Sequence, residues 1–116
     1  MGRLITKDSV LMNMFFKETI CYHIGENYYP FKLQNYQQGY IEFCNDIIYL
    51  TLYSGIRHII DNIVKVEILK LSNINPQIRI VLNDHNIYLF VPSKYDKNLA
   101  DENITLKLFK KLKCKK

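Results

Sequence analysis

The sequence predicts a mainly β domain: a small antiparallel barrel or sandwich of about seven strands, followed by a C-terminal amphipathic helix. Short runs rich in Ile, Tyr, Phe and Val recur between residues 39 and 93, and turn residues separate them. Ala, the best helix former, occurs once, at position 100. Antiparallel strands joined by short turns expose their edges unless the sheet closes, and a helix with one apolar stripe can cover the open end.

The strands are predicted from alternation and from the turns that bound them. Residues 18–24 alternate in strand fashion and lead into a loop that contains Gly25 and Pro30. Two-residue turns then follow at Asn45-Asp46, Ser54-Gly55 and Asp61-Asn62. The residues expected to point into the core are Ile41, Phe43, Ile48, Leu50, Val64, Val66, Ile68, Ile80, Leu82, Leu89 and Leu108. The last two strands, 77–82 and 86–91, flank the turn sequence Asn-Asp-His-Asn and are predicted to form a β-hairpin.

The C-terminal segment favours a helix. Ile104, Leu108 and Leu112 recur at every fourth position, acidic residues stand near its start and lysines near its end, as the helix dipole prefers. The alternative is a strand, because Ile104, Leu106 and Leu108 also alternate.

Length and charge indicate one domain, residues 1–116, with a basic C-terminal end at residues 107–116. The formal net charge is +5, but those last ten residues contain six lysines and no acid, so the rest of the chain is close to neutral. A neutral body with one basic end differs from the extended basic face of a typical nucleic-acid-binding fold.

The order of elements resembles the pleckstrin-homology superfold, and within it the GRAM-type domains, the WW-domain-binding protein family and the GLUE domains. The resemblance is carried by "DSVLM" (8–12), "GYIEFC-ND-IIYL" (39–50), "IDNIVKVEI" (60–68) and a final hairpin and helix (77–113). It implies a PH-like barrel closed by a C-terminal helix. The Thr and Arg that the family usually has around the first turn are replaced by Cys44, Asn45 and Asp46.

The same resemblance implies phosphoinositide binding through basic residues in the loop after the first strand. Here that loop offers only Lys32, beside Glu26, so the family's lipid site does not carry over.

No catalytic, cofactor or metal motif is expected. Cys21 and His23 share a strand face without a second ligand pair of matching spacing, which favours a buried thiol beside an ordinary imidazole. His58 and His85 stand singly at turns or strand starts. Asp46, Asp61 and Asp84 lie in turns, where Asp commonly bonds its own backbone. The scattered glycines form no phosphate-binding loop.

Two stretches are the candidate partner-binding regions. One is the aromatic, weakly charged segment 27–38, although its aromatic residues could instead fold back as core. The other is the lysine-rich C-terminal end, whose lysines could instead only solubilise the terminus. The residues are Tyr28, Tyr29, Phe31, Lys32 and Tyr36 in the first, and Lys110, Lys111, Lys113, Lys115 and Lys116 in the second.

The predicted function is therefore that of a non-enzymatic binding module, an adaptor or a subunit, which engages a protein partner. The alternatives are binding to phosphoinositides or another anionic membrane surface, nucleic-acid binding through the basic end, and an enzyme on an unrecognised scaffold. Three unpaired cysteines without a signal peptide, and no long apolar run, favour an intracellular protein, cytoplasmic or nuclear.

Overall fold

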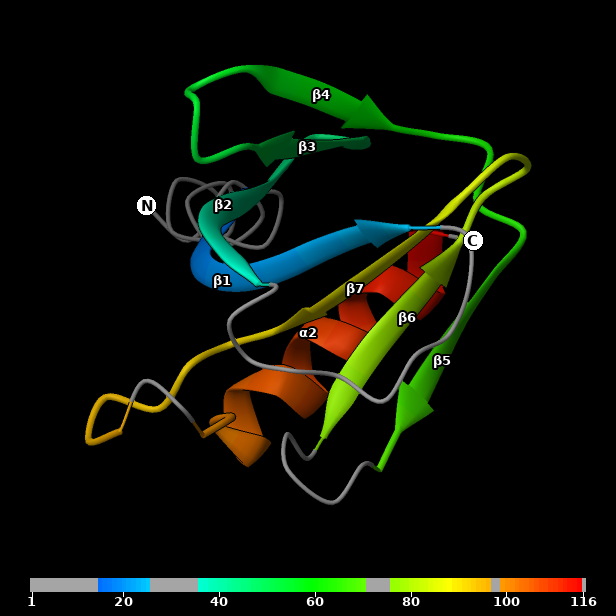
Figure 1. Ribbon diagram of the computed structural model, residues 1–116. Coiled ribbons are helices and arrows are strands. Elements are labelled where there is room, and N and C mark those ends of the chain that lie inside the picture. Colours follow the sequence, from blue (N-terminus) through cyan, green and yellow to red (C-terminus); the bar gives the residue numbers. More distant parts are fainter. Residues whose placement is uncertain (1–14, 26–35, 71–75, 97–98, 116) are drawn as a thin grey trace, which may run out of the picture.

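The computed structural model describes residues 15–25, 36–70, 76–96 and 99–115, and these form one curled sheet with a helix on it (Figure 1). The strands are β1 (Phe15–Gly25), β2 (Gln37–Cys44), β3 (Ile47–Thr51), β4 (Arg57–Ile60), β5 (Lys65–Leu69), β6 (Gln77–Val81) and β7 (Asn86–Phe90), and the helix is α2 (Glu102–Lys115). The mainly β fold class and the C-terminal helix are thus confirmed.

The strands pair antiparallel in the order β4-β3-β2-β1-β7-β6-β5. Strands β4 and β5 follow one another in the chain but lie at opposite ends of this order, so the sheet curls into a half-barrel with an open seam (Figure 1). The motif "DSVLM", which contributed to the family resemblance, lies outside the described residues.

The turns form where the sequence supplies residues that tolerate a left-handed backbone. Asn45, in the two-residue turn between β2 and β3, has φ of 57°, and Gly55 between β3 and β4 has φ of 94°. Asn62, between β4 and β5, has φ of 56°. Asn and Gly adopt this region more readily than other residues, which explains why the predicted turns at Asn45-Asp46 and Ser54-Gly55 are correct. The two-residue turn predicted at Asp61-Asn62 is wrong, because residues 61–64 connect β4 to β5 at the opposite end of the strand order and these two strands do not pair.

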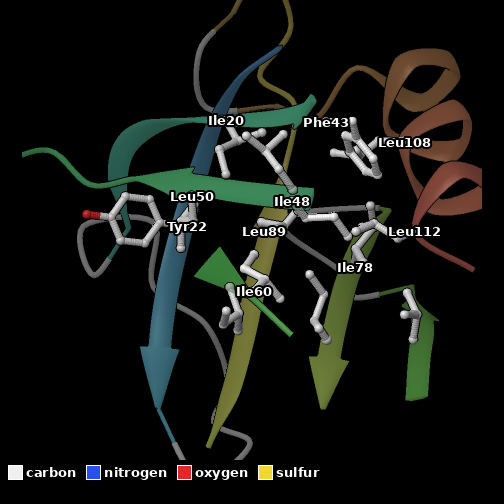
Figure 2. Packing of buried hydrophobic residues seen from close by; sticks show 14 of the residues in the cluster. Ile20, Tyr22, Phe43, Ile48, Leu50, Ile60, Ile78, Leu89, Leu108 and Leu112 are labelled. Carbon is white, nitrogen blue, oxygen red and sulfur yellow. The ribbon is translucent and has the colours of Figure 1, made fainter. Parts of the chain in front are cut away.

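The concave face of the sheet holds the main core, and Figure 2 shows Leu108 and Leu112 of α2 beside Phe43 and the inward side chains of the strands. Most of the residues predicted to point inward are buried, namely Ile41, Phe43, Ile48, Leu50, Val66, Ile80, Leu89 and Leu108. Ile68 and Leu82 are half-buried against the same cluster.

The prediction for Val64 is wrong. Its side chain is 48% exposed, although its N–H donates to the Val81 carbonyl at 2.8 Å. Val64 precedes the edge strand β5, and no described strand pairs with the other side of β5. Alternation correctly assigns Val64 to the same face as Val66, but it cannot show that this face is exposed to solvent at Val64.

A second, smaller core lies on the convex face of the sheet. Cys21, Tyr88 and Phe90 are buried there, and Tyr36 and Ala100 pack against them. Strands β1 and β7 are consequently buried on both faces around this point, which fits the nearly continuous apolar sequence of β7.

Helix α2 begins at a cap that the sequence supplies. The Asp101 carboxylate accepts a hydrogen bond from the Ile104 N–H at 3.0 Å, as an N-cap residue does. Leu108 and Leu112 are fully buried, so the helix is correct and the alternative strand is wrong. Thr105 is also fully buried, and its hydroxyl accepts a hydrogen bond from the Val91 N–H at 3.1 Å.

Candidate functional site

A cavity of about 640 Å³ occupies the open seam between β4 and the β6–β7 hairpin. This volume lies within the range usual for binding sites. Its apolar lining comes from inward or seam-facing residues of five separate segments: Ile24, Leu50, Ile59, Ile60, Leu82 and Ile87. The curl of the sheet brings these segments together, because β4 and the hairpin stand on either side of the seam (Figure 1).

The polar lining comes from β4, from the turn after it and from the β6–β7 turn, and comprises His58, Asp61, Asn62, Asn83, Asp84 and His85. His58 lies opposite Leu50 in the β3–β4 register, which directs its ring to the cavity side of the sheet. In the hairpin turn, the Leu82 N–H donates to the His85 carbonyl at 2.9 Å, and the Asp84 carboxylate lies 2.6 Å from Nδ1 of His85.

The electrostatic character of this lining is acidic. The cavity lining has two carboxylates, Asp61 and Asp84, and no described Lys or Arg lines it. The Asp84 side chain is 85% exposed, so its charge is available to a ligand at the rim.

The edge of β4 beside the cavity carries backbone groups that β3 does not use. The Leu52 N–H donates to the Ile56 carbonyl at 2.8 Å, so these two residues form a hydrogen-bonded pair. In an antiparallel ladder such pairs recur at every second position, which makes His58 and Ile60 the residues of β4 that bond to β3. This alternation turns the N–H and C=O groups of Arg57 and Ile59 away from β3. No strand in the described part of the chain pairs with that side of β4.

The convex surface next to this edge is apolar and aromatic. The described large apolar side chains that are exposed on this face of strands β2–β4 are Tyr40, Ile47 and Ile59, and Tyr53 and Ile56 are exposed in the connection between β3 and β4. Ile59 faces Tyr49 across the β3–β4 pair, and the guanidinium of Arg57 lies 4.0 Å from the centroid of the Tyr49 ring. Arg57 also lies 3.5 Å from the Glu42 carboxylate. Tyr, Ile and Arg at a surface are typical of protein interfaces.

Of the residues predicted from the aromatic loop, only Tyr36 lies within the described residues; Tyr28, Tyr29, Phe31 and Lys32 lie outside them. Tyr36 packs on Phe90, with ring centroids 5.4 Å apart, and its hydroxyl donates to the Gln77 side-chain oxygen. It is therefore part of the convex core and only half exposed.

The predicted lysines lie on the other face of the sheet, because α2 packs on the concave side. Lys110 and Lys113 are exposed, and the ammonium groups of Lys111 and Lys113 lie over the Phe16 and Phe109 rings at 5.1 Å and 5.4 Å. The side chain of Lys115, and Lys116, are outside the described part. The structure thus places Tyr36 and these lysines on opposite faces.

The Cys21-His23 pair stands in the convex core. Cys21 is buried, and the His23 ring lies between Tyr36 and Tyr88, at centroid distances of 6.0 Å and 6.3 Å. In the described ranges, no three His, Cys, Asp or Glu side chains are grouped so that they could hold a metal ion.

Sequence reasoning missed the cavity, because its lining is assembled from distant segments. The sequence puts Asp61 and Asp84 in turns and His58 and His85 singly at turns or strand starts, and nothing in these positions predicts that the four side chains line one cavity. One feature of the sequence does point to the seam. The strand before Asp61-Asn62 is short, with four residues, and short strands are typical of the edge of a sheet.

None of the described helices is long and apolar enough to cross a membrane. No family model matches the chain, and neither a curated protein nor a solved structure does.

Proposed function

We propose that the chain is a non-enzymatic binding module that engages a protein partner at the open seam, where an extended segment of the partner adds to the free edge of β4. One observation carries this proposal: the backbone groups of Arg57 and Ile59, which pair with no strand among the described residues, stand beside an apolar cavity. Strand addition supplies affinity through main-chain hydrogen bonds, and pockets for alternate side chains supply specificity.

The surroundings of β4 suit such an added strand on both faces. Successive side chains of a strand point to opposite faces of a sheet. Those on one face of the added segment would enter the cavity beside Ile60 and Ile87, and those on the other would pack near Arg57 and Ile59, of which Ile59 is 58% exposed. A long exposed apolar edge invites aggregation, whereas β4 has only four residues and carries Arg57.

The lysine-rich end of α2 is assigned a supporting role in the same proposal. Exposed Lys107, Lys110 and Lys113 would attract an acidic region of the partner, since complementary charge mainly raises association rates. The seam would then provide the specific contact.

The first test is a comparison of captured proteins. The wild-type chain, an Ile56→Ser/Ile59→Lys variant and a Tyr95→Ser/Leu99→Lys control are immobilised, and proteins captured from the native host are quantified by mass spectrometry. Tyr95 and Leu99 are also exposed, at 99% and 52%, but lie far along the chain from β4. We expect a protein that the wild type and the control retain and the β4 variant loses. If all three chains retain the same set, the proposal is wrong.

The second test examines the hydrogen bonds themselves. Amide exchange of the chain is measured with and without the protein recovered by that capture. The amides of Arg57 and Ile59 should exchange rapidly in the free chain and slowly in the complex, because strand addition engages them. Slow exchange confined to other segments would exclude pairing at β4.

A further inference from the structure

We infer that the seam cavity selects an extended partner segment with a Lys or Arg side chain among its inward-facing residues, accompanied by an aliphatic one. This inference rests on the proposed strand addition and specifies its ligand class. Two properties of the cavity carry it: its size relative to one side chain, and the position of its charges.

The size of the cavity calls for more than one side chain. Residues i and i+2 of a strand project from the same face about 7 Å apart. A space of about 640 Å³ along β4 accommodates two such side chains rather than one. The aliphatic lining that Leu50, Ile60 and Ile87 provide suits an apolar side chain or the methylene stem of a basic one.

The charges of the cavity select the second side chain. Asp61 and Asp84 enter the lining from opposite sides of the seam, one after β4 and the other in the β6–β7 turn. A cationic group at the rim would therefore lie between two carboxylates, while its stem stays in the aliphatic part. A carboxylate at the same place would be repelled from both sides, and an uncharged isostere would gain nothing from them.

The convex surface of β4 suits the outward-facing residues of the same segment. Ile59 and Tyr49 face one another across the β3–β4 pair, and Arg57 stacks over Tyr49. An apolar or aromatic outward residue would extend this row across the new strand pair. Alternate residues of the segment would thus contact different surfaces: the acidic cavity on one face and the apolar and aromatic row on the other.

The test uses blocked heptapeptides that alternate Thr with inward residues, in the order Thr-Val-Thr-X-Thr-Val-Thr, where X is arginine, citrulline or glutamate. Citrulline has nearly the shape of arginine without its charge. Each peptide is titrated into the ¹⁵N-labelled full chain at low salt, and amide shifts are followed. We expect shifts in residues 57–62 and 82–87, and an affinity for the arginine peptide about fivefold above that for the citrulline peptide, as for an ion pair at a partly open site. The glutamate peptide should bind weakest.

A variant of the protein isolates the carboxylates. Asp61→Asn/Asp84→Asn keeps the shape of both exposed side chains, so its melting temperature should match the wild type. The arginine and citrulline peptides should then bind equally. A matched Asp96→Asn/Glu102→Gln variant, which alters two exposed acids on segments that do not line the cavity, should retain the preference.

Several outcomes overturn the inference and are distinguishable from failure of the proposed function. Equal affinities for all three peptides, with shifts still at β4, would leave strand addition intact and remove the cationic selectivity. An absence of shifts at β4 with any peptide would reject strand addition here as well. If blocked single arginine binds as tightly as the heptapeptide, the occupant is a small cation and not a strand. If sedimentation shows that the free chain dimerises and Ile59→Lys abolishes the dimer, the occupant is a second copy of the chain.

Discussion

At the scale of single residues, a buried polar side chain fixes the position of the helix against the sheet. Thr105 joins α2 to the segment after β7, because its hydroxyl accepts the hydrogen bond of the Val91 N–H inside the core. The Asp101 N–H also donates to the Val91 carbonyl, at 2.7 Å. Both backbone groups of Val91 are thereby satisfied by the start of the helix, which fixes where the helix begins.

Replacing Thr105 by Val should destabilise the chain by about 1–3 kcal/mol, because the shape is kept and the buried Val91 N–H loses its acceptor. Thr105→Ser should retain most of the stability, since the hydroxyl remains. Urea unfolding of both variants, with the exposed Thr19→Val as control, measures the difference. If Thr105→Val were as stable as the wild type and only Thr105→Ser lost stability, the effect would belong to the methyl group rather than to the hydrogen bond.

The ion pair between Glu67 and Arg79 should make stability depend on pH. The hydrogen bond from Arg79 lowers the pKa of Glu67 below its ordinary value; burial opposes this effect, and the nearby charges of Arg79 and Lys65 reinforce it. A carboxyl whose pKa is lowered on folding stabilises the fold above its unfolded pKa. That contribution is lost as the pH falls from about 5 towards the folded pKa.

Glu67→Gln should therefore show a flatter decline of the unfolding free energy below about pH 5 than the wild type. The measurement is urea unfolding at several pH values from 3 to 7, with the exposed Glu102→Gln as the matched carboxyl removal. If Glu67→Gln and wild type decline in parallel, the pair contributes nothing that depends on the charge of Glu67.

At the scale of elements, local chemistry was sufficient for the hairpins and the helix. Asn45 and Gly55 allow left-handed turns, and Leu108 and Leu112 lie four residues apart on the buried side of the helix. A strand would also put both on one face, so the acidic start and basic end of the segment are what favour the helix. Alternation could not predict Val64, whose exposure depends on β5 being an edge. It also could not predict the convex core, because Tyr36 covers Phe90 from a separate segment.

A matched pair on β5 tests the register at this scale. Val66 is 6% exposed and lies opposite Ile80, whereas Val64, two residues earlier, is 48% exposed. Val66→Asp should cost roughly 3 kcal/mol or more, because it buries an unpaired carboxylate, and should unfold much of the population. Val64→Asp should cost well under about 1 kcal/mol. Circular dichroism melting of the two variants measures this contrast, and similar melting curves would show that the register of β5 is wrong.

At the scale of the whole molecule, charge is distributed unevenly over a nearly neutral body. Two carboxylates line the seam cavity, while the exposed lysines of α2 are grouped at the C-terminal end. The sequence predicted the basic end, because those lysines are contiguous. It could not predict the acidic seam, because Asp61 and Asp84 become neighbours of one cavity only when the sheet curls.

This distribution predicts how binding depends on salt. Lys110→Gln/Lys113→Gln should slow association with the protein recovered by capture at about 50 mM salt, and the difference should shrink at about 300 mM, where charges are screened over shorter distances. The dissociation rate and the melting temperature should change little, because both side chains are exposed. Lys70→Gln/Lys94→Gln removes the same charge from exposed sites elsewhere and should leave association nearly unchanged.

The same variants separate a protein partner from the other anionic surfaces that the basic end could meet. Vesicles containing phosphatidylserine and a single-stranded oligonucleotide are used as the alternative probes in the same salt series. If the lysines serve the protein partner, these probes bind the wild type weakly, since a short basic patch alone holds a membrane or a nucleic acid only marginally at physiological salt. If either probe binds the wild type tightly, loses binding with Lys110→Gln/Lys113→Gln, and leaves the β4 amides unchanged, the basic end serves a partner independent of the seam. Association with the captured protein that is equal for both lysine variants at both salt concentrations would restrict its recognition to β4 and the cavity.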